Sequence, residues 1–230
     1  MIRVRSSLVV FLGVLCALCG WSSPALAQSG PPASRFELGI GALWIGGEPL
    51  GTKTATETTG AGGTLALFSS SSELAGAAGV EGRVGVRLAR SLVAEVEASY
   101  LKPQLRIAIS ADAEGAAAVT ATETIQQFTI GGNLLWYLPG HRWSPRFAPF
   151  ATAGGGFVRQ LHEQATLLET GRFYQFGGGV SALVVSRGRF HAKGVGLRAD
   201  VRALIRSKGV AFDDGSKTSP AAGVSAFVRF

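Results

Sequence analysis

Apolar and polar residues alternate with a period of two along this chain in separate segments of 9–13 residues. In the clearest one, Phe36, Leu38, Ile40, Ala42 and Trp44 share one side, and Glu37, Gly39, Gly41 and Leu43 share the other. Such alternation is typical of a strand with one apolar face. The eight segments that we expect to be strands are 36–44, 78–88, 92–100, 128–138, 147–159, 174–184, 195–205 and 221–230. The pattern does not assign the faces of 147–159, where alanine and glycine dominate.

The connections between these segments alternate in character. Those after the first, third, fifth and seventh segments are longer on average and carry Asp, Glu, Ser and Thr; the others are shorter and basic. An even number of strands with long loops at one end is the arrangement of transmembrane barrels. We therefore expect an all-β fold, an eight-stranded antiparallel up-and-down transmembrane β-barrel. The Gly-, Thr- and Ser-rich stretch 47–77 is predicted to be a long loop, with 64–68 as a strand extension, and 109–122 a second loop.

Alternation alone does not distinguish a membrane barrel from a lipocalin-like barrel with its apolar side inward. The polar face is largely Gly and Ser apart from its charges, and its cations are all arginine, which suits buried carboxylate pairs better than lysine does. Large aromatic residues also fall near strand ends, as the interfacial belts of membrane barrels require. These residues are Phe36, Trp44, Tyr100, Trp136, Phe157, Tyr174 and Phe230. The apolar face is therefore predicted to point outward.

The inner face then carries charges of both signs. Its acids are Glu37, Glu81, Glu95, Glu97 and Asp200, and its bases are Arg83, Arg87, Arg198 and Arg202. The interior of an eight-stranded barrel is just wide enough for side chains to fill it. An unpaired buried charge costs several kcal/mol per ion. We expect a packed ionic network that plugs the lumen; the alternative interpretation is an ion path.

The amino terminus has the pattern of a secretory signal peptide. Arg3 and Arg5 precede an apolar run at 8–18, and a small-x-small site predicts cleavage between Ala27 and Gln28. The expected organisation is a signal peptide at 1–27, a short periplasmic lead at 28–34 and the barrel at 35–230. Both cysteines lie inside the signal, so the mature chain has neither a disulfide nor a thiolate metal site. The net charge of +7 comes without a Lys/Arg block, so we expect no nucleic-acid partner.

The carboxy-terminal segment sets Val224, Ala226, Val228 and Phe230 on one face and is predicted to close the ring by pairing with 36–44. Together with the signal peptide, the eight strands and the sequence Arg198-x-Asp200-x-Arg202, this ending resembles the small outer-membrane β-barrel family of the OmpA/OmpX type. The resemblance covers essentially the whole mature chain, without a periplasmic domain. It implies a location in the lipid of the bacterial outer membrane. It also implies that the barrel-assembly machinery recognises the terminal strand through Phe230.

Candidate chemistry is sparse. The histidines His141, His162 and His191 lie in turns or at a loop edge, and no catalytic set or metal-ligand pattern includes them. We expect no cofactor and no enzymatic activity. The expected function is a structural or surface-interaction role, in which loops 47–77 and 109–122 meet an extracellular partner. The alternative is a narrow pore or conduit for small or hydrophobic solutes, and a third possibility is a lipid-modifying enzyme.

Overall fold

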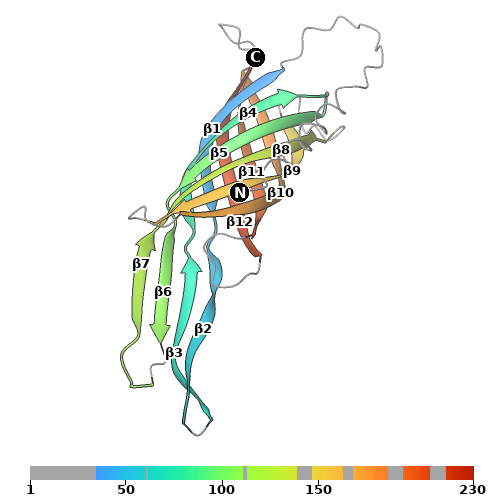
Figure 1. Ribbon diagram of the computed structural model, residues 1–230. Coiled ribbons are helices and arrows are strands. Elements are labelled where there is room, and N and C mark those ends of the chain that lie inside the picture. The colour runs from blue at the N-terminus through green and yellow to red at the C-terminus, as the bar shows by residue number, and fades with distance from the viewer. Residues whose placement is uncertain are drawn as a thin grey trace, which may run out of the picture. The chain divides into compact units, whose positions relative to one another are not determined.

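The computed structural model describes residues 35–60, 62–110, 113–138, 147–162, 168–185, 194–207 and 216–230. The expected signal peptide with its Ala27–Gln28 cleavage site, the lead at 28–34, His141 and His191 lie outside these ranges. The described residues form twelve β-strands (Figure 1). They contain no helix that is long and apolar enough to span a membrane.

Eight of the strands form the barrel and four form a second sheet. The barrel strands are β1 (Phe36–Ile45), β4 (Ala77–Arg87), β5 (Leu92–Leu101), β8 (Gln126–Tyr137), β9 (Phe147–Leu161), β10 (Leu168–Val185), β11 (Gly194–Ser207) and β12 (Lys217–Arg229). The second sheet consists of β2 (Glu48–Thr58), β3 (Thr64–Leu74), β6 (Gln104–Ser110) and β7 (Val119–Thr124).

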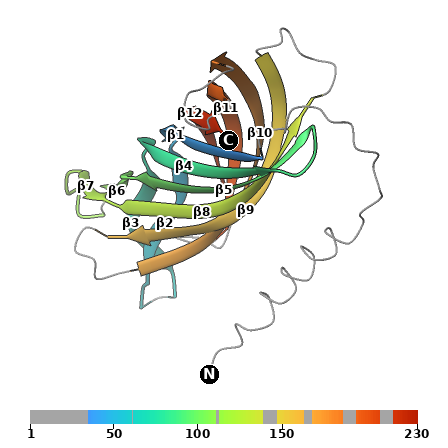
Figure 2. The ribbon, with the colours of Figure 1, turned by 90° about the horizontal axis from the view of Figure 1, so that it is seen from above.

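The barrel is closed, with the strand order β1-β12-β11-β10-β9-β8-β5-β4, and every neighbouring pair is antiparallel. Figure 2 shows the strands following one another around the wall. These are the eight predicted segments, so the expected fold class is confirmed. The ring closes between β1 and β12, where Leu38 faces Val228 and Ala42 faces Val224, as the sequence predicted.

The apolar face of the barrel points outward, as predicted. Ile40 and Val201, for example, are 70% and 66% exposed. A protein surrounded by water rarely exposes so many large apolar side chains in one continuous surface. The structure also assigns β9, whose faces the sequence left open. Phe150 and Val158 are buried inside the ring, whereas Phe157 is exposed on the outer wall. The wall is therefore a surface suited to lipid.

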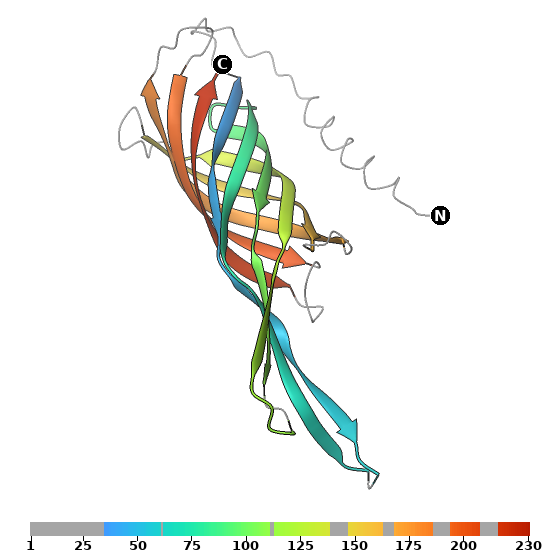
Figure 3. The same ribbon diagram turned by 90° about the vertical axis from the view of Figure 1, so that its left-hand side faces the viewer.

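The prediction that 47–77 is a long loop was wrong. Within 109–122, residues 113–118 form a loop as expected, whereas 109–110 and 119–122 lie in β6 and β7. These regions contribute to a four-stranded sheet of order β2-β3-β6-β7, which we call the extension sheet (Figures 1 and 3). The hairpin β2–β3 is inserted between β1 and β4, and the hairpin β6–β7 between β5 and β8. Thr52, Thr54, Thr56 and Thr58 alternate with a period of two, and the β-branched threonine fits strands well, although the composition resembles a loop.

The extension sheet has a small hydrophobic core where it joins the barrel. Leu50, Leu74, Leu105 and Ile125 pack together there, and each is buried. Because membrane barrels have short periplasmic turns and longer extracellular connections, the end that carries this sheet is the extracellular end. Burying the four side chains, at about 1.5–3 kcal/mol each, stabilises the junction between the two sheets.

Candidate functional site

The middle of the lumen holds a cluster of buried charges centred on Arg202, whose side chain is 3% exposed. Its Nη1 lies 2.8 Å from Glu97 Oε2, its Nη2 lies 2.9 Å from Glu81 Oε2, and its Nε lies 2.5 Å from Asp200 Oδ2. One guanidinium thus engages carboxylates from three strands, β4, β5 and β11. This use of the planar, multiply donating group is the reason that arginine is favoured over lysine at such a position.

Two further arginines complete the central ionic cluster. Arg83 pairs with Glu81 and lies 3.1 Å from Asp200 Oδ1. Arg198 Nη1 lies 2.7 Å from Glu95 Oε2, and its Nε lies 3.5 Å from Asp200 Oδ1. Asp200 therefore contacts all three arginines, which offsets much of the cost of removing these charges from water.

Alternation along the strands places these residues together. Residues two apart on a strand share a face, so Glu81 and Arg83 on β4 point inward. The register between strands then brings opposite charges together, since Arg83 lies directly opposite Glu97 on β5. On β12, Gly223 leaves the space that the cluster fills: a Cβ there would lie 3.1 Å from Glu81 Oε1 and 3.3 Å from Arg202 Nη2.

Two uncharged residues belong to the same cluster and were missed in the sequence. Gln175 Nε2 donates a hydrogen bond to Asn133 Oδ1 at 2.7 Å and another to Glu97, while Arg202 Nη1 donates to Gln175 Oε1 at 3.2 Å. The signal that could have found them is their parity, because both stand at inward positions of β10 and β8.

The other two residues of the expected network lie apart from this cluster. Glu37 pairs with Arg229 across the β1–β12 seam, with Oε2 and Nε 2.7 Å apart. Arg87 donates a hydrogen bond of 3.2 Å to the carbonyl of Arg90, and its guanidinium lies 5.8 Å from the centre of the Tyr137 ring. Arg229 was missed as a lumen cation, although it alternates with Val228 and Phe230 and therefore stands at an inward position.

Apolar layers lie on both sides of the central cluster. Toward the periplasmic end, Val93, Leu135 and Phe150 pack together, and the Arg198 guanidinium lies 4.5 Å from the centre of the Phe150 ring. Toward the extracellular end, a second layer is formed by Leu43, Leu101 and Ala221. Buried side chains thus occupy the interior at several levels, as the narrow bore of an eight-stranded barrel favours.

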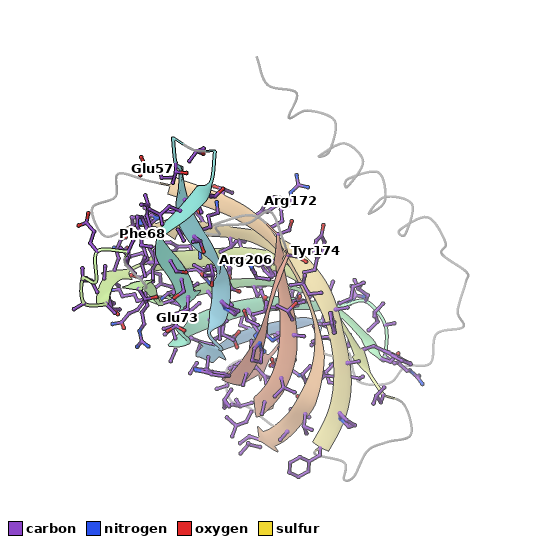
Figure 4. The ribbon with its side chains drawn as sticks, turned by 90° about the horizontal axis from the view of Figure 1, so that it is seen from below. Glu57, Phe68, Glu73, Arg172, Tyr174 and Arg206 are labelled. Carbon is purple, nitrogen blue, oxygen red and sulfur yellow. The ribbon has the colours of Figure 1, made fainter. Side chains whose placement is uncertain are left out.

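Polar contacts join the extension sheet to the barrel mouth. Glu48 of β2 pairs with Arg206 of β11 and accepts a hydrogen bond of 2.7 Å from Ser219 Oγ of β12. Figure 4 shows Arg206 beside β2. On the other hairpin, Glu123 Oε1 lies 2.8 Å from His162 Nδ1, so His162 contacts a strand that the sequence had not predicted. A cavity of about 50 Å³ lies next to Glu48 and Arg206.

The extension sheet has two different faces. Paired residues of neighbouring strands share a face, and the series Lys53–Ser70–Ile109–Val119 runs across all four strands. This face also carries Leu65 and Phe68, and it continues into the buried Leu74–Leu105 pair. Its apolar residues Leu65, Phe68, Ile109 and Val119 are 38–62% exposed. We call it the apolar face; Phe68 is labelled in Figure 4.

The opposite face of the extension sheet is covered with hydroxyl groups. Its residues include Thr52, Thr54, Thr56 and Thr58 of β2, Thr64, Ser69 and Ser71 of β3, Ser110 of β6, and Thr120 and Thr122 of β7. The charged pair on this face, Arg106 and Glu73, has its atoms 3.4 Å apart, and both side chains are at least half exposed. We call it the hydroxyl face.

None of the described residues forms a group of three or more His, Cys, Asp or Glu side chains suited to a metal ion. The buried carboxylates of the lumen are instead matched by guanidinium groups. That arrangement orders and neutralises charge inside the barrel.

No protein-family model matches the sequence, and no curated protein matches it. Among solved structures, the chain is similar to the outer membrane protein OprG from Pseudomonas aeruginosa, with a TM-score of 0.51 and 11% identity over 86% of this chain and 96% of that one. The fold is that of a small outer-membrane β-barrel. The location expected from the sequence, the bacterial outer membrane, agrees with this fold and with the apolar outer wall.

Two other solved structures align with this chain over nearly their whole length. Neisserial surface protein A has a TM-score of 0.48 and 15% identity, over 84% of this chain and 95% of that chain. Ail, the attachment invasion locus protein of Yersinia pestis, was solved in complex with the heparin analogue sucrose octasulfate; it has a TM-score of 0.42 and 10% identity, over 86% and 99% of the two chains.

Proposed function

We propose that this protein is an outer-membrane anchor for an extracellular interaction surface, and that the extension sheet is that surface. The observation that carries the proposal is the apolar face, where Val119 is 62% exposed and lies opposite Ile109 in the sheet. Contiguous exposed apolar side chains mark interaction sites more often than scattered ones do. The extracellular partner expected through 47–77 and 109–122 would bind here.

The filled interior supports the same proposal. The central ionic cluster and the apolar layers above and below it fill the lumen. A filled barrel is suited to support the extension sheet and not to form a wide channel. The proposal assigns no catalytic activity to the chain. Lipid A mass spectra from cells with and without the protein are expected to be the same.

The proposal is tested with cells that display the full chain, measured for adhesion to an apolar polystyrene surface. Changing Phe68→Ser together with Val119→Ser is expected to reduce adhesion, because both changes remove apolar area from the apolar face. The matched control, Thr54→Ser with Thr120→Ser, alters the hydroxyl face and is expected to leave adhesion unchanged. Equal adhesion by all three proteins, at equal surface levels, would refute the proposal.

A second candidate function is a conduit for small apolar solutes. The cavity of about 50 Å³ at the barrel mouth favours it, because Leu74, Leu101, Phe173 and Leu204 contribute to its lining and Leu74 also belongs to the core of the extension sheet. Planar-bilayer recordings and uptake of a small apolar dye into proteoliposomes distinguish the two functions. The anchor predicts neither stable channels nor uptake; the conduit predicts uptake that Leu101→Trp blocks by filling the cavity.

A further inference from the structure

Three cations stand on the outer wall of the barrel at its extracellular end. Lys102 directly follows β5, Arg159 belongs to β9, and Arg172 belongs to β10. All three are exposed. Strand parity sets each of them on the lipid-facing side, because Leu101, Gln160 and Phe173, their chain neighbours, are buried in the interior.

Each cation adjoins an aromatic residue of the extracellular belt. Lys102 Nζ lies 5.9 Å from the centre of the Tyr100 ring. Arg159 is directly opposite Phe128, and Arg172 is directly opposite Phe157. Directly opposite residues have Cβ atoms about 4.5–5.5 Å apart. The Tyr100 and Phe128 rings are themselves in contact, with centroids 4.7 Å apart, so the pairs form one continuous sector over β5, β8, β9 and β10.

We call these residues the cation–aromatic sector: Lys102, Arg159 and Arg172 with Tyr100, Phe128, Phe157 and Tyr174. Figure 4 shows Arg172 and Tyr174 next to each other at the barrel wall. Tyr174 lies two residues farther along β10 than Arg172, on the same side, and is 57% exposed. The aromatic residues therefore stand nearer the apolar middle of the wall, and the cations nearer the water.

The sector is restricted to one side of the barrel. At the corresponding level on the other four strands, the described outward residues are uncharged: Ile205 on β11, Thr218 and Pro220 on β12, Trp44 on β1 and Ala78 on β4. The described outward positions of β5, β8, β9 and β10 carry no carboxylate. The cations of the sector are thus not matched by acids on their own surface, in contrast to those of the lumen.

A ligand that suits this sector has an anionic headgroup and apolar chains. Guanidinium groups bind phosphate oxygens in bidentate fashion, and aromatic side chains favour the headgroup level of a membrane. Below the aromatic residues, Ile130, Leu134 and Phe176 offer an exposed apolar wall for acyl chains. We propose that the cation–aromatic sector binds the phosphate-bearing headgroup of an outer-leaflet lipid, with the chains along β8, β9 and β10.

This inference depends on the barrel being in a membrane and not on the extension sheet as an interaction surface. It is tested on the full folded chain in detergent, by native mass spectrometry with lipid A, with dephosphorylated lipid A and with inorganic phosphate as a competitor. The variant replaces all three cations: Lys102→Gln, Arg159→Gln and Arg172→Gln. The control removes three exposed cations elsewhere: Lys53→Gln, Arg90→Gln and Arg106→Gln. Heat modifiability on gels verifies that each protein is folded.

The sector variant is expected to bind lipid A about tenfold more weakly than the unaltered chain, since it loses three charge-assisted contacts. The control is expected to bind as the unaltered chain does, and dephosphorylated lipid A is expected to bind all three proteins weakly and equally. Equal loss in the control would reduce the effect to net charge and overturn the proposal. If millimolar inorganic phosphate displaced lipid A completely, the sector would bind free phosphate, and the proposal that its ligand is a lipid headgroup would be wrong.

Discussion

Replacing Arg202 with methionine tests whether the central ionic cluster holds the barrel together. Methionine retains much of the side-chain length, so the change removes mainly the charge and its hydrogen bonds. In the unaltered chain four carboxylates, Glu81, Glu95, Glu97 and Asp200, stand against the guanidinium groups of Arg83, Arg198 and Arg202. Without Arg202 two guanidinium groups remain for four carboxylates. Breaking a buried ion pair by removing one partner costs about 3–5 kcal/mol, because the other charge stays buried.

The assay is urea unfolding of the protein in phospholipid vesicles, followed by the gel shift between folded and unfolded forms. The control is Arg106→Met on the extension sheet, whose partner Glu73 lies 3.4 Å away with both side chains at least half exposed. Exposed pairs of this kind contribute about 0–1 kcal/mol. Adding Glu97→Met to Arg202→Met is expected to recover part of the loss. If Arg202→Met were no more destabilising than Arg106→Met, the cluster would not have the structural role assigned to it.

Three other changes are expected to have measurable effects. Gly223→Val is expected to destabilise the barrel by about 1–3 kcal/mol through overpacking. The control Gly82→Val is expected to leave stability unchanged, because a Cβ at Gly82 would meet nothing within 4 Å. The urea midpoints of the two variants are compared. Glu48→Leu removes the partner of Arg206 and Ser219, so trypsin is expected to cut the extension sheet faster while the barrel still shifts on gels. Deleting Phe230 removes its backbone hydrogen bonds of 3.0 Å with Phe36 and Arg35; a lower yield of folded protein in the outer membrane is expected, and a normal yield would contradict the assembly-signal prediction.

The barrel could be predicted from the sequence because its strands obey one rule throughout. Lipid on one side and a narrow lumen on the other require a strict alternation of apolar and polar residues. The strands around Ile40, Val84 and Val201 follow this alternation without interruption. The same rule indicated which side would carry the charges. Even the terminal pairing of β1 with β12 followed, since a closed ring leaves those two strands no other partner.

The extension sheet could not be predicted in the same way, because water surrounds both of its faces beyond the junction. Threonine and serine on the hydroxyl face resemble loop composition. In addition, one extra residue in each strand, Leu50 in β2 and Leu67 in β3, forms a bulge that interrupts the alternation. The pairing of ions inside the barrel was also beyond the sequence. Parity places Glu37 and Arg87 inside, but only the register puts Glu37 beside Arg229 and leaves Arg87 near Tyr137.

The seam between β1 and β12 has a kinetic consequence. The ion pair between Glu37 and Arg229 joins residues 192 positions apart, whereas Arg87 and Val93 face each other across the turn from β4 to β5. The entropic cost of closing a loop rises with the logarithm of its length, so bringing the seam together costs on the order of 2–3 kcal/mol more than closing that hairpin. Neighbouring hairpins are therefore expected to form early and the seam last, which makes the edges of β1 and β12 the exposed edges of an unfinished barrel.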